Sequence, residues 1–112
     1  MIDRKIKGEF LEMKRHPISS IENGEEVLYF PRRFMHSIRG GLMINAWVVY
    51  LFIAGVCSDN KSYSTNLTNK ELAEKSRLSE STIKRALTGL EKYHFIERNY
   101  SGHIREIKLL DY

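Results

Sequence analysis

The chain has 112 residues, of which 42% are hydrophobic and 29% are charged. This length holds one hydrophobic core and this composition is that of a folded domain, which argues against disorder, a repeat array and a multi-domain assembly. The single cysteine, Cys57, cannot form an internal disulfide, so a disulfide-stapled secreted scaffold is excluded and a cytoplasmic protein is expected. Lys and Arg (18) outnumber Asp and Glu (14), and the formal net charge of +4 suits a polyanionic partner.

Residues 1–41 form an N-terminal extension of mixed charge with short strand or helix elements. The apolar spacing from Ile6 to Met13 fits one helical face, and an extended segment over Phe10–Lys14 fits nearly as well. The segment Glu22–Glu25 is typical of a turn. It leads into a short β-like stretch, Val27–Pro31, which the proline confines to the edge or the end of a sheet.

An almost uninterrupted apolar run follows over residues 42–57. It includes Asn45 and is shorter than the ~20 apolar residues that a membrane span needs. We therefore expect a buried central helix and no membrane association. The side chains expected in the core at helical spacing are Trp47, Tyr50, Leu51 and Ala54.

The residues around Thr68 predict the start of a second helix, over residues 69–76. The Thr68 hydroxyl can accept a hydrogen bond from the Glu71 amide, while the Glu71 carboxylate accepts one from the Thr68 amide, which makes a capping box. Leu67 before the cap and Leu72 after it are spaced for a hydrophobic staple.

Arg77–Ser79 interrupts this helix, and Ser79 can cap a third helix over residues 80–93. One face of the third helix is apolar and should pack inward: Ile83, Ala86, Leu87 and Leu90. The opposite face carries hydroxyls and cations and no acid: Ser81, Arg85, Thr88 and Lys92, with Lys84 and Thr82 on its flanks.

Residues 95–110 predict a β-hairpin, because β-branched and aromatic residues flank the Ser-Gly turn signal at residues 101–102. Two short helices joined by a three-residue turn have the dimensions of a helix-turn-helix, in which the second helix enters the major groove of DNA. Arg85 lies at the centre of the cationic face and can donate two hydrogen bonds to guanine. The residues expected to contact double-stranded DNA are Thr68, Asn69, Lys70, Ser79, Ser81, Thr82, Lys84, Arg85, Thr88, Arg98, His103 and Arg105.

The segments Leu67–Ala73, Leu78–Leu87 and Phe95–Arg98 together resemble the winged helix-turn-helix superfamily. The chain is similar to small bacterial, phage and plasmid regulators and to the N-terminal domain of plasmid and phage replication initiators. The resemblance implies a mainly α fold with a small β component (α+β), in which residues 42–112 form a three-helix core followed by a C-terminal hairpin wing. It also implies sequence-specific binding of double-stranded DNA.

The sequence departs from that pattern at two positions. Arg77 stands where the turn usually has a glycine, and His94 stands where a glycine usually follows the recognition helix. If both keep a left-handed backbone, each side chain costs on the order of 1 kcal/mol.

The leading functional expectation is a small transcriptional regulator, cytoplasmic and associated with the nucleoid. A DNA-binding protein for the replication or maintenance of a mobile genetic element and a protein-interaction module are the alternatives. No catalytic motif, metal-ligand spacing or cofactor loop is present in the sequence, so neither an enzyme nor a cofactor is expected. A homodimer is a further expectation, formed through residues 1–41, the apolar helix or an exposed strand edge.

Overall fold

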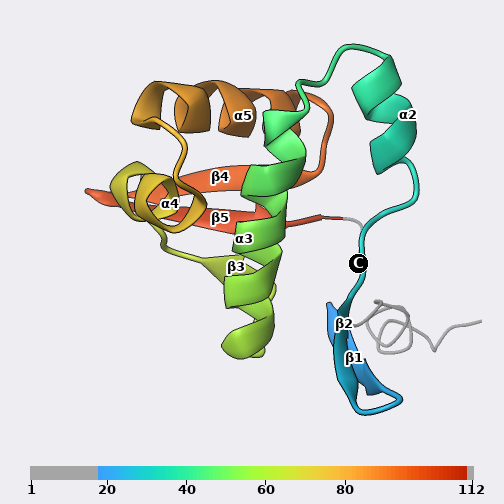
Figure 1. Cartoon of the computed structure of the whole chain (residues 1–112). Coiled ribbons are helices and arrows are strands. Elements are labelled where there is room, and N and C mark those ends of the chain that lie inside the picture. The colour runs from blue at the N-terminus through green and yellow to red at the C-terminus, as the bar shows by residue number, and fades with distance from the viewer. Residues whose placement is uncertain (1–17, 111–112) are drawn as a thin grey trace, which may run out of the picture.

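The computed structural model of the chain describes residues 18–110, and within them it forms an α+β fold with four helices and two small sheets (Figure 1). The segment from Ile6 to Met13, expected to be helical or extended, lies outside the described residues. The elements in chain order are β1 (Ser19–Glu22), β2 (Glu25–Leu28), α2 (Phe34–Arg39), α3 (Asn45–Asp59), β3 (Ser64–Thr65), α4 (Asn69–Ser76), α5 (Glu80–Lys92), β4 (Ile96–Ser101) and β5 (Ile104–Leu109).

The first sheet is the antiparallel hairpin β1–β2. Its two central turn residues, Asn23 and Gly24, have φ values of 54° and 81°. Two successive positive φ angles characterise the hairpin turn whose twist matches that of the strands, and Asn-Gly is its preferred sequence. The turn predicted at Glu22–Glu25 is therefore confirmed, while the strand after it ends at Leu28, before Pro31.

The second sheet is antiparallel, in the order β3-β5-β4. Its main part is the β4–β5 hairpin, which lies within the predicted residues 95–110 and turns at Gly102, where φ is 64°. The short strand β3, which the sequence analysis did not anticipate, pairs Ser64 with Lys108 and Thr65 with Ile107. This pairing ties the connection between α3 and α4 to the hairpin.

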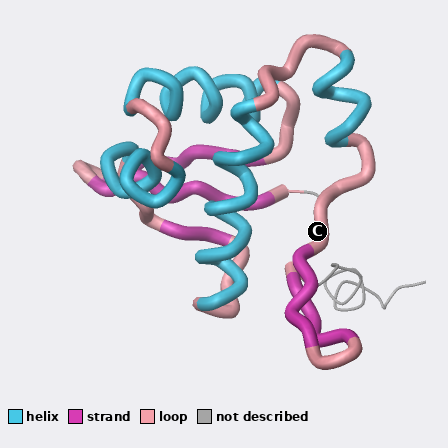
Figure 2. The backbone as a smooth tube through the Cα atoms, in the orientation of Figure 1, coloured by secondary structure: helices cyan, strands magenta, loops and turns pink. Residues whose placement is uncertain are grey.

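Helices α3, α4 and α5 pack against one another, and α3 and α5 also pack against the three-stranded sheet (Figures 1 and 2). The fully buried side chains come from all of these elements, which indicates one continuous core. Its largest fully buried side chains are Tyr50, Phe95, Ile53, Leu72, Ile83, Leu87, Leu90, Ile96, Ile107 and Leu109.

The apolar helix differs from its prediction in both its ends and its buried face. It begins at Asn45 and not at Leu42, and it continues through Asp59. Its core face comprises Ala46, Val49, Tyr50, Ile53, Ala54 and Cys57. The burial predicted for Tyr50 and Ala54 is confirmed, but Trp47 is 49% and Leu51 39% exposed. In a run that is apolar on every side, periodicity cannot indicate which stripe will meet the core.

The short helix α2 was not predicted, because its six residues are too few for a periodic signal. It is tied to the end of α5 by Arg33, whose guanidinium donates to the carbonyls of Tyr93 and His94 at 2.6 Å each and lies 3.9 Å from the centroid of the Phe95 ring. Phe34 packs beside the same ring, with a centroid separation of 4.4 Å. These contacts hold α2 against the core.

The N-terminal caps predicted for α4 and α5 are confirmed. The Thr68 hydroxyl accepts from the Glu71 amide at 3.1 Å, and the Glu71 carboxylate accepts from the Thr68 amide at 2.9 Å. Ser79 caps α5 by accepting from the Thr82 amide at 3.1 Å. Helix α4 spans the predicted residues 69–76, whereas α5 ends one residue earlier than predicted, at Lys92.

Candidate functional site

The outer face of α5 is the first part of the candidate site. Four of the residues expected to contact DNA are exposed along it: Ser81, Lys84, Arg85 and Thr88. The buried face of the same helix contains the four apolar residues predicted for it, Ile83, Ala86, Leu87 and Leu90. Their burial fixes the rotation of α5, so the hydroxyl and cationic side chains project to solvent.

Capping hydrogen bonds organise the first turn of this face. Ser79 Oγ donates to Thr82 Oγ1 at 2.9 Å, and the Arg85 guanidinium lies 3.4 Å from the same Thr82 oxygen. Ser79 and Thr82 are therefore partly engaged in forming the helix start. Arg85 and Lys84 remain exposed and can reach a partner beyond the surface.

The second part of the site is a groove of about 560 Å³ where the starts of α4 and α5 meet the end of the β4–β5 hairpin. It collects five of the residues expected to contact DNA from segments more than thirty positions apart: Thr68, Asn69, Lys70, His103 and Arg105. The first residues of α4 and of α5 line this groove, and the N-terminus of a helix carries a partial positive charge. Lys70 and His103 are exposed there.

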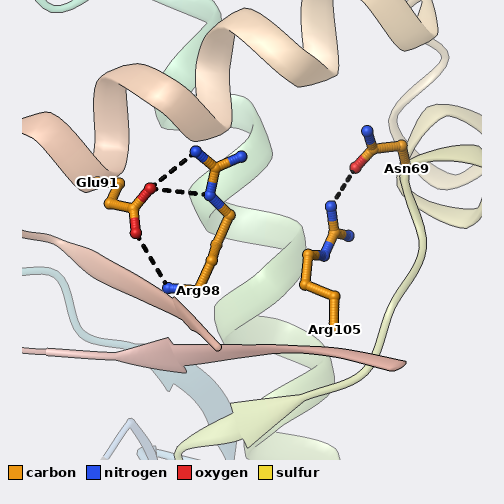
Figure 3. Close-up of polar contacts among 4 residues, drawn as sticks. All are labelled: Asn69, Glu91, Arg98 and Arg105. Carbon is orange, nitrogen blue, oxygen red and sulfur yellow. Dashed lines mark hydrogen bonds and ion pairs between the residues drawn. The ribbon is translucent and has the colours of Figure 1, made fainter. Parts of the chain in front are cut away.

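Arg105 holds the groove together. Its guanidinium donates to the Asn69 side-chain oxygen (Figure 3). It also donates to the Leu67 carbonyl. Burial is the main reason that the pKa of Arg105 is lowered from its ordinary value. Two of the side chain's donor groups are thus directed into the protein, and the hairpin is fastened to the start of α4.

Arg98 is a diagonal neighbour of Arg105 in the hairpin, but its side chain is held by an acid of α5. Its Nε and Nη2 atoms donate to Glu91 Oε1 at 3.0 and 2.7 Å, and its backbone amide donates to Glu91 Oε2 at 3.3 Å (Figure 3). The Arg98 side chain is only 20% exposed. Hydrogen bonding from this guanidinium lowers the pKa of the Glu91 carboxyl. In this arrangement Arg98 joins α5 to β4 instead of facing solvent.

The acids of α5 lie beside the cationic face. Glu91 is paired with Arg98 in β4, which neutralises its charge locally. Glu80 is exposed in the first turn and lines the groove near the hairpin. The outer face itself is free of acids, as the sequence analysis expected, whereas the groove contains one.

Two exposed apolar residues of the hairpin were missed by the sequence analysis. Tyr100 is 69% and Ile104 is 59% exposed, and both line the groove. Tyr100 stands directly opposite Arg105 in the strand register. The only sequence signal for them is their position next to the Ser-Gly turn, because strand alternation by itself does not tell which face will be covered.

Among residues 18–110, no helix is long and apolar enough to cross a membrane, and no group of three or more His, Cys, Asp or Glu side chains is placed to hold a metal ion. Comparisons of the chain with protein-family models, with curated proteins and with solved structures found no match.

Proposed function

We propose that this protein binds double-stranded DNA in a sequence-specific manner, with α5 as the recognition helix, and that it acts as a small transcriptional regulator. The observation that carries the proposal is the acid-free outer face of α5, where Arg85 and Lys84 stand between hydroxyl side chains. Hydroxyls and cations are the groups that hydrogen-bond to phosphates and base edges.

The order of the elements supports this proposal. A helix, a short strand, two helices joined by a three-residue turn and a β-hairpin follow one another from α3 to β5. Apart from the short strand β3, this is the arrangement that the resemblance to the winged helix-turn-helix superfamily implies, with α4–α5 as the helix-turn-helix and β4–β5 as the wing. The positive φ angles at Arg77 (63°) and His94 (64°) fit the two positions where that superfamily usually has glycine.

The proposed contacts divide into two groups. Arg85, at the centre of the exposed face, reads base edges in the major groove, while Ser81, Lys84 and Thr88 contact phosphates or neighbouring bases. Lys70 and His103 contact the phosphate backbone on the side of the groove. Arg98 and Arg105 support this surface through their internal hydrogen bonds, and the proposed base and phosphate contacts do not include Arg98.

The hairpin contributes Tyr100 and Ile104 to the same surface. Apolar side chains on DNA-binding hairpins and arms pack against sugars or insert at a base step of the minor groove. The exposure of these two residues beside His103 suits that role. The alternative of a protein-interaction module would use the same two residues as its apolar anchor.

The decisive experiment is selection of bound sequences from a random duplex pool, followed by titration of the selected duplex with variants. We expect enrichment of a defined sequence, and Arg85→Ala should weaken binding to it by roughly tenfold to a hundredfold while relaxing the preference at one position. Lys75→Ala is the matched control, because it removes one exposed cation from α4 outside the proposed surface. Binding of random and selected duplex with equal affinity would reject sequence-specific recognition.

A further inference from the structure

An apolar groove lies on the side of the molecule that the proposed DNA surface does not use. It has a volume of about 420 Å³ and is formed by α2, the segment before it and the start of α3. Met35 and Trp47 line it and are 67% and 49% exposed. Exposed apolar surface of this kind marks a site of interaction.

The walls of this groove are held in place by aromatic contacts. Phe30 packs edge-on against both Trp47 and Phe34, with ring centroids 6.4 Å apart in each case. Phe34 in turn packs on Tyr50 in the core at 5.1 Å. The groove is thus preformed, which lowers the entropic cost of filling it.

The rim of the groove is cationic. The segment of residues 30–41 contains three arginines and no acid. Arg32 and Arg39 are exposed on it, and Arg32 lines the groove itself. A partner for this surface should combine an apolar side chain with carboxylates.

The β1–β2 hairpin has that chemistry. Residues 19–28 contain three acids, Glu22, Glu25 and Glu26, and no cation. All three acids are exposed. Ile21 lies next to Glu22 and is 71% exposed, more than any other large apolar side chain within residues 18–110. Within that range, each of the two strands pairs only with the other, so both outer edges of the hairpin are open.

The hairpin of one chain does not fill the groove of the same chain. Its base is fixed at the end of α3, because Ile18 is buried in the core and Ser19 hydrogen-bonds to Ser58. Its turn extends away from α2 (Figure 1). Two copies related by a two-fold axis can exchange hairpins, which makes two identical contacts and closes the assembly.

We propose that a second copy of this chain covers the groove, with the acidic β1–β2 hairpin of each copy seated on the α2–α3 groove of the other. Ile21 enters the apolar groove, and Glu26, which stands opposite Ile21 in the hairpin register and shares its face, meets the arginines at the rim. This inference does not depend on DNA binding, since it uses neither the outer face of α5 nor the β4–β5 hairpin.

Charge reversal tests the contact in solution. We expect sedimentation equilibrium of the full chain to give twice the mass of one chain, and both Arg32→Glu/Arg39→Glu and Glu25→Lys/Glu26→Lys to weaken dimerisation by roughly tenfold or more. A mixture of the two variants should restore the dimer, because each then meets the opposite charge on its partner. Glu74→Lys/Glu97→Lys is the control, with two exposed acids reversed on α4 and β4.

Trp47 supplies a second readout, because it is the single tryptophan of the chain and lines the groove. Its emission should shift to shorter wavelength as the protein concentration rises, and Met35→Asp should abolish the shift while circular dichroism stays unchanged. A chain that sediments as a monomer at every concentration would overturn the proposal and leave another partner as the occupant of the groove. A dimer that both charge-reversed variants retain would also overturn it.

Discussion

Three helices are each followed by a non-glycine residue whose backbone is left-handed, a conformation that glycine adopts more easily. Lys61, Arg77 and His94 have φ values of 53°, 63° and 64° and follow α3, α4 and α5. After α3 and α5 the next amides bond back to the helix: Ser62 to the Cys57 carbonyl and Phe95 to the Leu90 carbonyl. These two hydrogen bonds satisfy a carbonyl in the last turn of each helix and hold the left-handed residue in place.

Replacing Arg77 with glycine should therefore stabilise the protein. The left-handed conformation costs a residue with a Cβ about 1 kcal/mol, and glycine adopts it freely, so we expect Arg77→Gly to raise the free energy of unfolding by ~0.5–1 kcal/mol. Urea denaturation measures the change. Arg77→Ala is the control, because it removes the guanidinium and keeps the Cβ. An equal gain from alanine would show that the side chain, and not the backbone, is the source of strain.

The Glu91–Arg98 pair makes a second prediction at this scale, and it depends on pH. Arg98 lowers the pKa of Glu91 below the ordinary value of 4.5, so the pair contributes stability above that pH and loses it as the pH falls through the pKa of the folded state. We expect Arg98→Ala to cost about 1 kcal/mol at neutral pH, because the pair is partly exposed, and the difference from wild type to shrink in acid.

Denaturation at neutral and at acidic pH checks this prediction. Arg98→Lys keeps the charge but loses the pair of guanidinium hydrogen bonds, so its free energy of unfolding should lie between those of the wild type and of Arg98→Ala. If Arg98 instead contacted phosphate, Arg98→Ala would reduce the salt dependence of DNA binding and leave the pH dependence of stability unchanged.

At the scale of elements, the start of α4 determines the shape of the candidate site. The capping box fixes where the helix begins, and the adjacent Asn69 receives the Arg105 side chain of the hairpin. A loss of the cap therefore affects both the helix and one wall of the groove.

Thr68→Ala should lower the free energy of unfolding by about 1 kcal/mol, the ordinary cost of removing a threonine cap. Thr68→Ser keeps the hydroxyl and should restore most of this stability, as thermal denaturation of the two variants would show. If serine and alanine destabilise equally, the methyl group and not the capping hydrogen bond is responsible.

For the whole molecule, the net charge of +4 is less informative than its distribution. The acidic β1–β2 hairpin, the cationic rim of the α2–α3 groove and the cationic face of α5 are distinct surfaces. The last of these predicts that DNA binding will depend steeply on salt. With four to six phosphate contacts in each chain, the logarithm of the association constant should fall by about 4 to 5 for each tenfold rise in salt.

Fluorescence anisotropy titrations at several salt concentrations measure this slope. Lys84→Ala should reduce the slope by about 1, because one phosphate contact is removed. Tyr100→Ala should weaken binding without changing the slope. A slope near zero for the wild-type chain would contradict a phosphate-binding surface.

The sequence by itself determined the features that depend on neighbouring residues. The cap at Thr68, the cap at Ser79, the Asn-Gly turn and the apolar stripe of α5 each involve groups within a few positions, so local sequence specifies them. The rotation of α5, and with it the outward position of Arg85, follows from that stripe.

Only the tertiary structure decided which cations remain exposed and which apolar residues do. Arg98 and Arg105 look like solvent-facing cations in the strand pattern, but Glu91 and Asn69 approach them from helices elsewhere in the chain. Trp47 lies in a wholly apolar run, and only the packing of α3 against its neighbours leaves it at the surface. Such contacts join residues far apart in sequence, and they depend on how the helices and the sheet assemble, which local spacing does not encode.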